Sequence, residues 1–290
     1  MTGTIAILGG NGVYARHLIP CLTAAGYPVR AVVRRPEAAG MARACGAQIR
    51  TADIFDTAAM TAAFEGCAVA INLATTLPGP SGRGDFAAND RLRVEGAPNF
   101  IAACHAAGVT RIIQQSIGFV NASGSDAWSS EETVFNADPD TIAGRAIIAA
   151  LAMEETIRAS GLDWLILRGG LFYGPGSGFD ERWFASAGAG KLRMPGDGSD
   201  YVSLVHIADM AAATVAAVAR WPSRQALIVC DDEPVRWHEL FGFIAACQGQ
   251  PAPEPGGAAG FPSFRLRNTR AVAALDWEPF FTSYRVGLAR

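Results

Sequence analysis

Lysine is almost absent from this chain of 290 residues: Lys191 is the only one, and charged residues make up just 18% of the composition. The net charge is −3 and no long basic run occurs, so we expect neither nucleic acid nor an anionic membrane as a partner. The longest alanine-rich stretch, 210–219, is shorter than the roughly 20 apolar residues that a membrane span needs. The first residues show no secretory signal pattern, and we therefore expect a cytoplasmic protein.

Paired cysteines are also lacking. The six cysteines are widely spaced, and none forms a Cys-x-x-Cys pair or has a histidine at ligand spacing. We interpret them as small apolar residues in a reducing compartment and expect no metal site.

A strand–turn–helix–strand pattern opens the chain. The apolar run 5–8 leads into a turn with small residues at Gly9, Gly12 and Ala15, then into an amphipathic segment and a second apolar run at 29–33. In a dinucleotide fingerprint the first glycine makes the tight turn, the second admits the pyrophosphate and the third position packs helix on strand. The helix amino terminus offers N–H groups to the phosphates. The alternative is a glycine turn in an ordinary α/β protein.

The choice of dinucleotide depends on the end of the second strand. Arg34 and Arg35 stand there, and no acidic residue precedes Glu37. Basic side chains at this place favour the 2′-phosphate of NADP, with NAD as the alternative cofactor. The other interpretation is two solvated arginines in a loop.

Alternation of apolar runs and helical segments continues over the first two thirds of the chain. Further strands are expected at 47–52, 69–74, 111–115, 163–168, 201–206 and 226–230. This pattern predicts an α/β fold, a doubly wound parallel Rossmann sheet with a small C-terminal substrate-binding cap. We assign residues 1–169 to the dinucleotide-binding domain, with 201–230 returning to it, and residues 170–200 and 231–290 to the cap.

Polar residues follow two of these strands. Asp53 is placed to accept from an adenine amino group or to cap the next helix, and for Asp56 we prefer the capping role. Thr75 begins a loop, 75–85, that we expect to line the ligand crevice. In the cap, Phe179, Trp183 and Phe184 suggest either an apolar pocket or simple packing.

Several segments together resemble the extended short-chain dehydrogenase/reductase family, the NAD-dependent epimerase/dehydratase group. They are 9–15, 52–56, 72–74, 95–99, 116–120, 167–175, 205–211 and the closing 275–288. The resemblance implies cofactor contacts at Gly9, Asn11, Gly12, Val13, Asp53, Ile54, Leu73, Ala74, Gly170 and Leu171. It also implies that Ser116 hydrogen-bonds the reacting oxygen of the substrate.

The chain departs from that family at the catalytic Tyr-x-x-x-Lys pair, in which a lysine cation lowers the pKa of the tyrosine. Counting back from Glu155 places the tyrosine position on Ile147 and the lysine position on Leu151. Arg93 replaces an asparagine of the family. Tyr173 or His206 could move the proton instead, although packing explains the first equally well and local capping the second.

The sequence thus predicts an NAD(P)-dependent, epimerase/dehydratase-like oxidoreductase with an atypical proton relay. A small carbonyl, alcohol or sugar-nucleotide would be the substrate, with Ser116, Tyr173 and His206 as catalytic candidates. The alternative is a non-catalytic NADP(H)-binding sensor of the same superfamily. A homodimer with a helix-rich interface is compatible with either.

Overall fold

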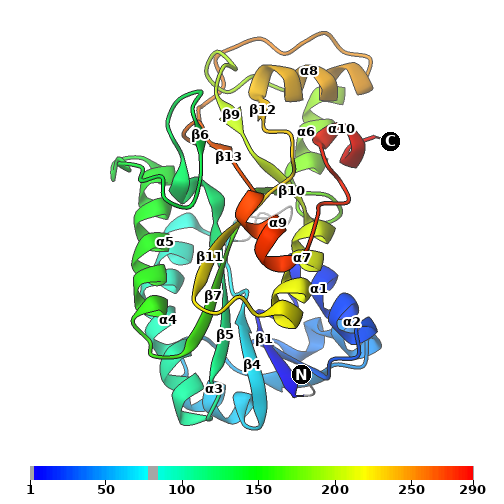
Figure 1. Cartoon of the computed structure of the whole chain (residues 1–290). Helices are drawn as coiled ribbons and strands as arrows, with labels where there is room; N and C mark the ends of the chain where they lie inside the picture. Colours follow the sequence, from blue (N-terminus) through cyan, green and yellow to red (C-terminus); the bar gives the residue numbers. More distant parts are fainter. Residues whose placement is uncertain (1–2, 78–83, 290) are drawn as a thin grey trace.

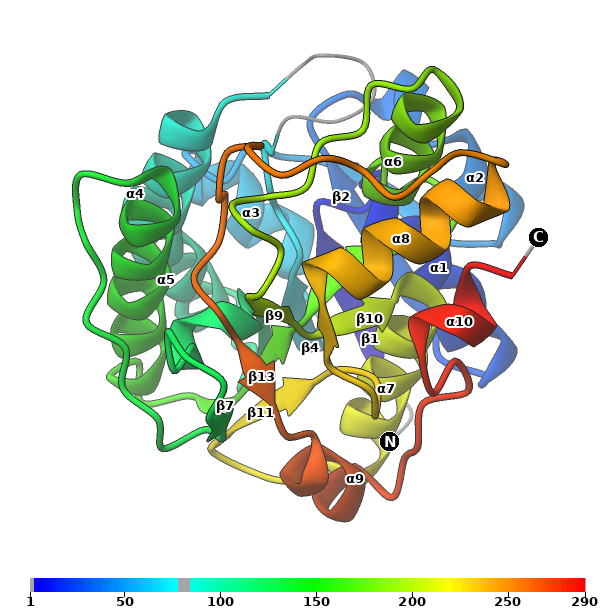
Figure 2. The ribbon, with the colours of Figure 1, turned by 90° about the horizontal axis from the view of Figure 1, so that it is seen from above.

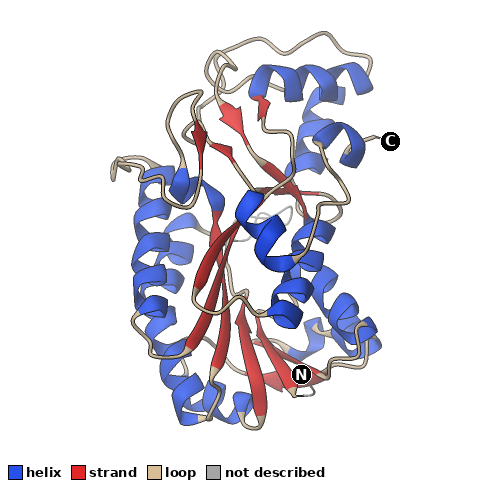
Figure 3. Ribbon diagram, viewed as in Figure 1, coloured by secondary structure: helices blue, strands red, loops and turns tan. Residues whose placement is uncertain are grey.

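The computed structural model describes residues 3–77 and 84–289, and its centre is a sheet of seven parallel strands (Figures 1 and 3). The strands are β1 (Thr4–Leu8), β2 (Val29–Val33), β3 (Gln48–Thr51), β4 (Cys67–Asn72), β5 (Arg111–Ile117), β7 (Asp163–Gly169) and β11 (Gln225–Val229). Their spatial order is β11-β7-β5-β4-β1-β2-β3, so β1 lies between β2 and β4. The chain reverses direction across the sheet there, and ligands bind at such a switch point.

Helices cover both faces of this sheet. On one face lie α1 (Val13–Ala24), α2 (Gly40–Ala44) and α7 (Ile207–Arg220), and on the other α3 (Thr57–Phe64), α4 (Phe86–Ala106) and α5 (Ile142–Arg158). Strand β1 shows why: Ile5 and Ile7 pack in the core of the first layer, while Ala6 and Leu8 pack in that of the second. A strand buried on both faces is apolar throughout, which is the pattern of a parallel sheet. The predicted doubly wound fold is confirmed.

A smaller region stands over the carboxyl ends of the strands (Figures 1 and 2). It consists of three two-stranded sheets and several helices around a core of its own. The paired strands are β8 (Leu171–Tyr173) with β10 (Leu204–His206), β9 (Tyr201–Val202) with β12 (Val235–Arg236), and β6 (Trp128–Ser129) with β13 (Arg265–Leu266). The helices are α6 (Phe179–Gly188), α8 (Trp237–Cys247) and α10 (Tyr284–Gly287). Helix α9 (Thr269–Leu275) instead packs against α7 and β11, with its buried residues in the core of the first sheet face. Two 3₁₀ turns, η1 (Pro36–Ala38) after β2 and η2 (Gly118–Asn121) after β5, are the other described elements.

One local prediction needs correction. The expected strand 201–206 is split into β9 and β10, because Ser203 is bound from both sides: its carbonyl accepts from Leu171 N, and its hydroxyl donates to the Phe264 carbonyl. In the cap, the glycine-rich stretch 176–200 contains helix α6, whose start is fixed by Glu181 accepting from the Gly178 N–H.

Disulfides, metal sites and membrane-spanning helices were not expected, and the described residues show the following. Their six cysteines are free thiols, and no group of histidine, cysteine and acidic side chains within 3–77 and 84–289 could hold a metal ion. None of the helices in those ranges combines the length and the apolar character that crossing a membrane requires.

Candidate functional site

The turn between β1 and α1 has a backbone that only glycine fits well. Gly9 has φ of +80°, and a Cβ there would lie 2.9 Å from backbone atoms of Leu73. The Gly12 N–H donates to the Gly9 carbonyl at 2.9 Å, and Gly12 is the N-cap of α1. Within the described part of the chain, no side chain caps this helix, so its first N–H groups are left to bind an anion.

A pocket of about 100 Å³ lies beside this turn, at the carboxyl ends of β1, β2 and β4. Nine residues expected to contact the cofactor line it: Gly9, Asn11, Gly12, Arg34, Asp53, Ile54, Leu73, Ala74 and Thr75. Leu8, Val32, Ala52, Phe55 and Leu92 complete the lining. The elements that the fingerprint connects therefore meet at one cavity, and the glycine turn forms one of its walls.

Four expected cofactor residues do not line this pocket. Val13 begins α1, and Arg35 follows Arg34 on the exposed side of the chain. Gly170 and Leu171 lie past the end of β7, where their N–H groups donate to Val229 and Ser203 carbonyls. Residues 78–83 of the expected crevice loop lie outside the described residues.

The two aspartates after β3 have different partners. Asp56 is the N-cap of α3 and accepts from the Ala59 N–H at 2.9 Å, so its predicted capping role is confirmed. Asp53 lines the pocket, and its Oδ1 accepts from the Phe55 N–H at 3.0 Å within its own turn. This contact holds the carboxylate at the pocket edge.

Helix α5 shifts the assignment of the missing catalytic pair by one residue. Glu154, rather than Glu155, faces the sheet: it is 1% exposed, whereas Glu155 lies on the outer surface. Counting back from Glu154 on the same helix face gives Ala150 and Ala146 in place of Leu151 and Ile147. Leu151 is 40% exposed on the outside of the helix, which excludes it from the crevice. On this count alanine methyl groups would stand at the tyrosine and lysine positions, and Ile147 is fully buried beside them.

Ser116 is bound to a buried carboxylate. Its Oγ donates to Glu154 Oε1 at 2.7 Å, and Arg168 donates to both oxygens of the same carboxylate. Burial raises the pKa of Glu154, but its contacts with Arg168, Ser116 and Arg158 outweigh that effect and hold the pKa below its usual value. An ionised carboxylate only accepts hydrogen bonds, so Ser116 must be the donor. Its single hydrogen is then not available to a substrate oxygen.

Tyr173 and His206 occupy packed positions. Tyr173 is fully buried, and its hydroxyl lies 3.4 Å from the Ser283 carbonyl; burial raises its pKa. His206 caps α7 through Nδ1, which accepts from the Ala208 N–H at 3.2 Å, and its ring lies 3.8 Å from that of Phe281. Burial lowers the pKa of His206 to about 4. These contacts favour the packing and capping interpretations over proton transfer.

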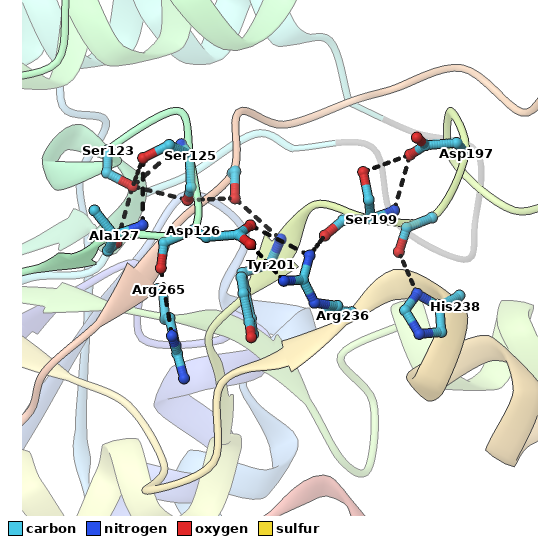
Figure 4. Close-up of polar contacts among 12 residues, drawn as sticks. Ser123, Ser125, Asp126, Ala127, Asp197, Ser199, Tyr201, Arg236, His238 and Arg265 are labelled. Atoms are coloured by element: carbon cyan, nitrogen blue, oxygen red, sulfur yellow. Dashed lines mark hydrogen bonds and ion pairs between the residues drawn. The ribbon is translucent and has the colours of Figure 1, made fainter.

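The other histidines and the cap loops are held by local contacts. His17, His105 and His238 each bond a backbone carbonyl. Figure 4 shows Arg236 bound to Asp126, with the Tyr201 ring nearby. The guanidinium of Arg236 lies 4.3 Å from the Tyr201 ring centroid and that of Arg265 lies 4.5 Å from it. This cluster ties the loop after β5 to the cap and holds no acid–base pair.

These features define a class of protein: a Rossmann fold with a dinucleotide pocket at its switch point and a cap over the strand ends. A family model described as NAD(P)H-binding matches residues 9–220. The chain belongs to this NAD(P)H-binding family, and its likeness to solved epimerases confirms the expected fold.

Among curated proteins, a 3-diazoavenalumate denitrifying reductase of a Streptomyces species is 31% identical, with 99% of each chain covered. Among solved structures, the UDP-glucose 4-epimerase of Thermotoga maritima has a TM-score of 0.81 at 20% identity, covering 98% of this chain and 96% of its own. The UDP-glucose 4-epimerase of Thermus thermophilus, solved with NAD, has a TM-score of 0.78 at 18% identity, with coverage of 98% and 96%. This protein is thus a reductase-like enzyme of an NAD(P)-binding family, with the fold of the solved epimerases.

Two residues of the site could not be found by spacing. Leu92 reaches the pocket from α4, and Glu154 reaches Ser116 across 38 positions of the chain. The one available signal for Glu154 was a glutamate on the apolar face of a predicted helix, which requires a buried partner.

Proposed function

We propose that this protein is an NADPH-dependent reductase that replaces the diazonium-type diazo group of an aromatic carbon by hydrogen and releases dinitrogen. The observation that carries this proposal is that residues 3–77 and 84–289 offer neither the tyrosine–lysine pair nor a free serine hydroxyl at the expected reaction centre. Ala146 and Ala150 stand where the family has its tyrosine and lysine, and the hydrogen of Ser116 points to Glu154.

Reduction of a carbonyl group creates an alkoxide, which needs a positioned donor to stabilise and protonate it. Reduction of a diazonium-type carbon differs: a C–H bond forms with the electron pair of the hydride, the C–N bond breaks, and its electron pair leaves with N₂. Atoms and charge balance without a proton. A bound reduced nicotinamide supplies the hydride, and the residues of this chain need only hold the two reactants together.

The similarity to a 3-diazoavenalumate denitrifying reductase supports this reaction, because that relative matches the chain over nearly its full length. Other relatives are named as reductases of ketones and sugar nucleotides, at about 25% identity. Named reductases among the relatives favour an enzyme over the non-catalytic sensor.

The cofactor site fits a dinucleotide through its backbone. A Cβ at Gly9 would collide with Leu73, so this place is kept open, and the uncapped start of α1 suits a pyrophosphate. Asp53 would accept from the adenine amino group. Arg34 lines the pocket and favours NADP through the 2′-phosphate.

The cap, residues 170–200 and 231–290, would select the substrate. Its aromatic residues support an apolar pocket only in part: Phe184 is 4% exposed in the cap core, whereas Phe179 and Trp183 are half-buried. A cytoplasmic location and a homodimer stay predictions.

The test is a turnover assay with NADPH, comparing an aromatic diazo carboxylate with matched ketones. We expect NADPH oxidation and N₂ release in a one-to-one ratio with the diazo compound, and at least about 100-fold slower reduction of ketones, the size of effect that a missing proton donor has. Efficient ketone reduction with an inert diazo compound would reject the proposal.

A further inference from the structure

One stripe of helix α4 faces the dinucleotide pocket. Leu92 lines the pocket, and a Cβ at Gly96 would lie 2.7 Å from Cδ1 of Ile54, which also lines it. One turn earlier, Asn89 Oδ1 accepts from the Thr76 N–H at 3.0 Å, in the loop after β4. Positions 89, 92, 93 and 96 share a helix face, so Arg93 belongs to this stripe.

Asn89 carries a buried donor without a partner. The residue is 1% exposed, and the contact with Thr76 fixes which end of its amide is oxygen. The other end, Nδ2, has no hydrogen-bond partner among the described residues. Leaving such a donor unsatisfied is unfavourable, which suggests that a ligand completes it.

Arg93 has free donors on the same face. Its side chain is 9% exposed, and Nη1 donates to the Ala146 carbonyl at 3.1 Å and lies 3.5 Å from Asp90 Oδ1. Over residues 3–77 and 84–289, Nε and Nη2 make no hydrogen bond. Arg93 therefore reaches α5 through Nη1 alone, at the backbone of Ala146.

We propose that Asn89 and Arg93 together bind a carboxylate of the substrate, with Nδ2 and the Nε–Nη2 edge as donors. The Nε and Nη2 atoms of an arginine can donate to both oxygens of a carboxylate in a bidentate contact. Residues four apart on a helix have their Cβ atoms about 6 Å apart, so both side chains can reach one ligand. The contact orients the substrate beside the cofactor pocket. This proposal deepens the proposed function. The role of the carboxylate contact in the reaction rests on that function, whereas the binding of a carboxylate does not.

The experiment measures binding without turnover. Calorimetry on the NADP-loaded protein compares cinnamate with cinnamamide, which has the same shape but no charge. The variants are Arg93→Met and Asn89→Asp; the aspartate still accepts from the Thr76 N–H but offers no donor. Arg91→Met is the control, because Arg91 lies on the exposed side of α4 and is paired with Glu95.

We expect Arg93→Met to weaken cinnamate binding by about 30-fold and Asn89→Asp by about tenfold, as for hydrogen bonds to a charged group. Binding of cinnamamide and of NADPH changes by less than about twofold, and the control behaves as wild type. Equal weakening of both ligands, an effect on NADPH alone, or no preference of the wild type for cinnamate overturns the proposal. If Arg93→Met does not fold, Asn89→Asp decides.

The two proposals fail separately. If the protein binds cinnamate through Arg93 but does not reduce diazo compounds, the carboxylate site is supported and the proposed reaction is rejected. If it reduces diazo compounds and Arg93→Met has the same KM as wild type, the reaction is supported and the carboxylate site is rejected.

Discussion

Ser116 Oγ donates a hydrogen bond of 2.7 Å to Glu154 Oε1, and Arg168 holds the same carboxylate from the neighbouring strand. The contact joins β5 to α5 below the expected reaction centre. Ser116 thus belongs to a buried charged network, and we expect its role to be structural rather than donation to a substrate oxygen.

Replacing Ser116 by alanine should reduce stability rather than catalysis. Loss of a buried hydrogen bond to a charged group costs about 1.5–3 kcal/mol, whereas kcat for a diazo substrate should change by less than about twofold. Ser130→Ala is the matched control, because Ser130 makes a 2.7 Å contact with Glu132 at an exposed site. Urea unfolding and steady-state kinetics separate the two effects. A large loss of kcat at unchanged stability would restore Ser116 as a catalytic residue.

Gly9→Ala tests the glycine turn, with Gly26→Ala as control. Both glycines have positive φ, +80° and +83°, so both variants suffer a backbone cost of about 1–2 kcal/mol. The two sites differ in the space around the new Cβ. At Gly9 the Cβ would collide with backbone atoms of Leu73, whereas at Gly26 no atom lies within 4 Å of it. We expect Gly9→Ala to lose at least about tenfold in NADPH affinity, because the displaced turn disturbs the pyrophosphate site. Equal NADPH affinity in both variants would contradict the turn's role.

Arg34→Ala should remove the preference for NADPH. A guanidinium–phosphate contact is worth about 1.5–3 kcal/mol, so the Kd for NADPH should rise by about 10–100-fold while that for NADH stays nearly constant. Arg35→Ala is the control, since Arg35 does not line the pocket. Titration by fluorescence measures the Kd of each of the three proteins for both cofactors. Equal affinity of the wild type for both cofactors would remove the basis of this assignment.

The burial of His206 should make the free energy of unfolding depend on pH. Burial lowers its pKa to about 4 from the 6.5 expected in the unfolded chain, so the unfolded state binds more protons between these values. The contribution to stability is therefore complete above pH 6.5 and is lost as the pH falls toward 4. His206→Asn retains a capping side chain and removes this titration. We expect a smaller loss of Tm between pH 7 and 4 in the variant than in wild type; parallel curves would count against the burial of a neutral histidine.

The dinucleotide pocket was predictable because it depends on local spacing. The turn at Gly9 and Gly12, the acidic turn at Asp53 and the residues after β4 each follow a strand end, and a parallel sheet brings strand ends together. The reaction centre was less predictable. Glu154 and Glu155 are neighbours in the sequence, and which of them faces the sheet depends on the rotation of α5 about its axis. The sequence pattern does not fix that rotation to within one residue.

Long-range contacts explain the remaining differences. Glu154 meets Ser116 only after α5 packs on β5, and the Ser203 contacts that split the expected strand come from distant Leu171 and Phe264. The alternatives weighed for Tyr173 and His206 could be decided only by the C-terminal segment that packs against them.

Proton independence of the reduction is the most direct test of the central claim. We propose single-turnover measurements with NADPH and an aromatic diazo carboxylate in H₂O and in D₂O, from pH 6 to 9. The account predicts equal rates in both solvents, no dependence on pH, and a product whose new hydrogen is protium from the cofactor even in D₂O. A solvent isotope effect on the rate, or deuterium at the former diazo carbon, would contradict it.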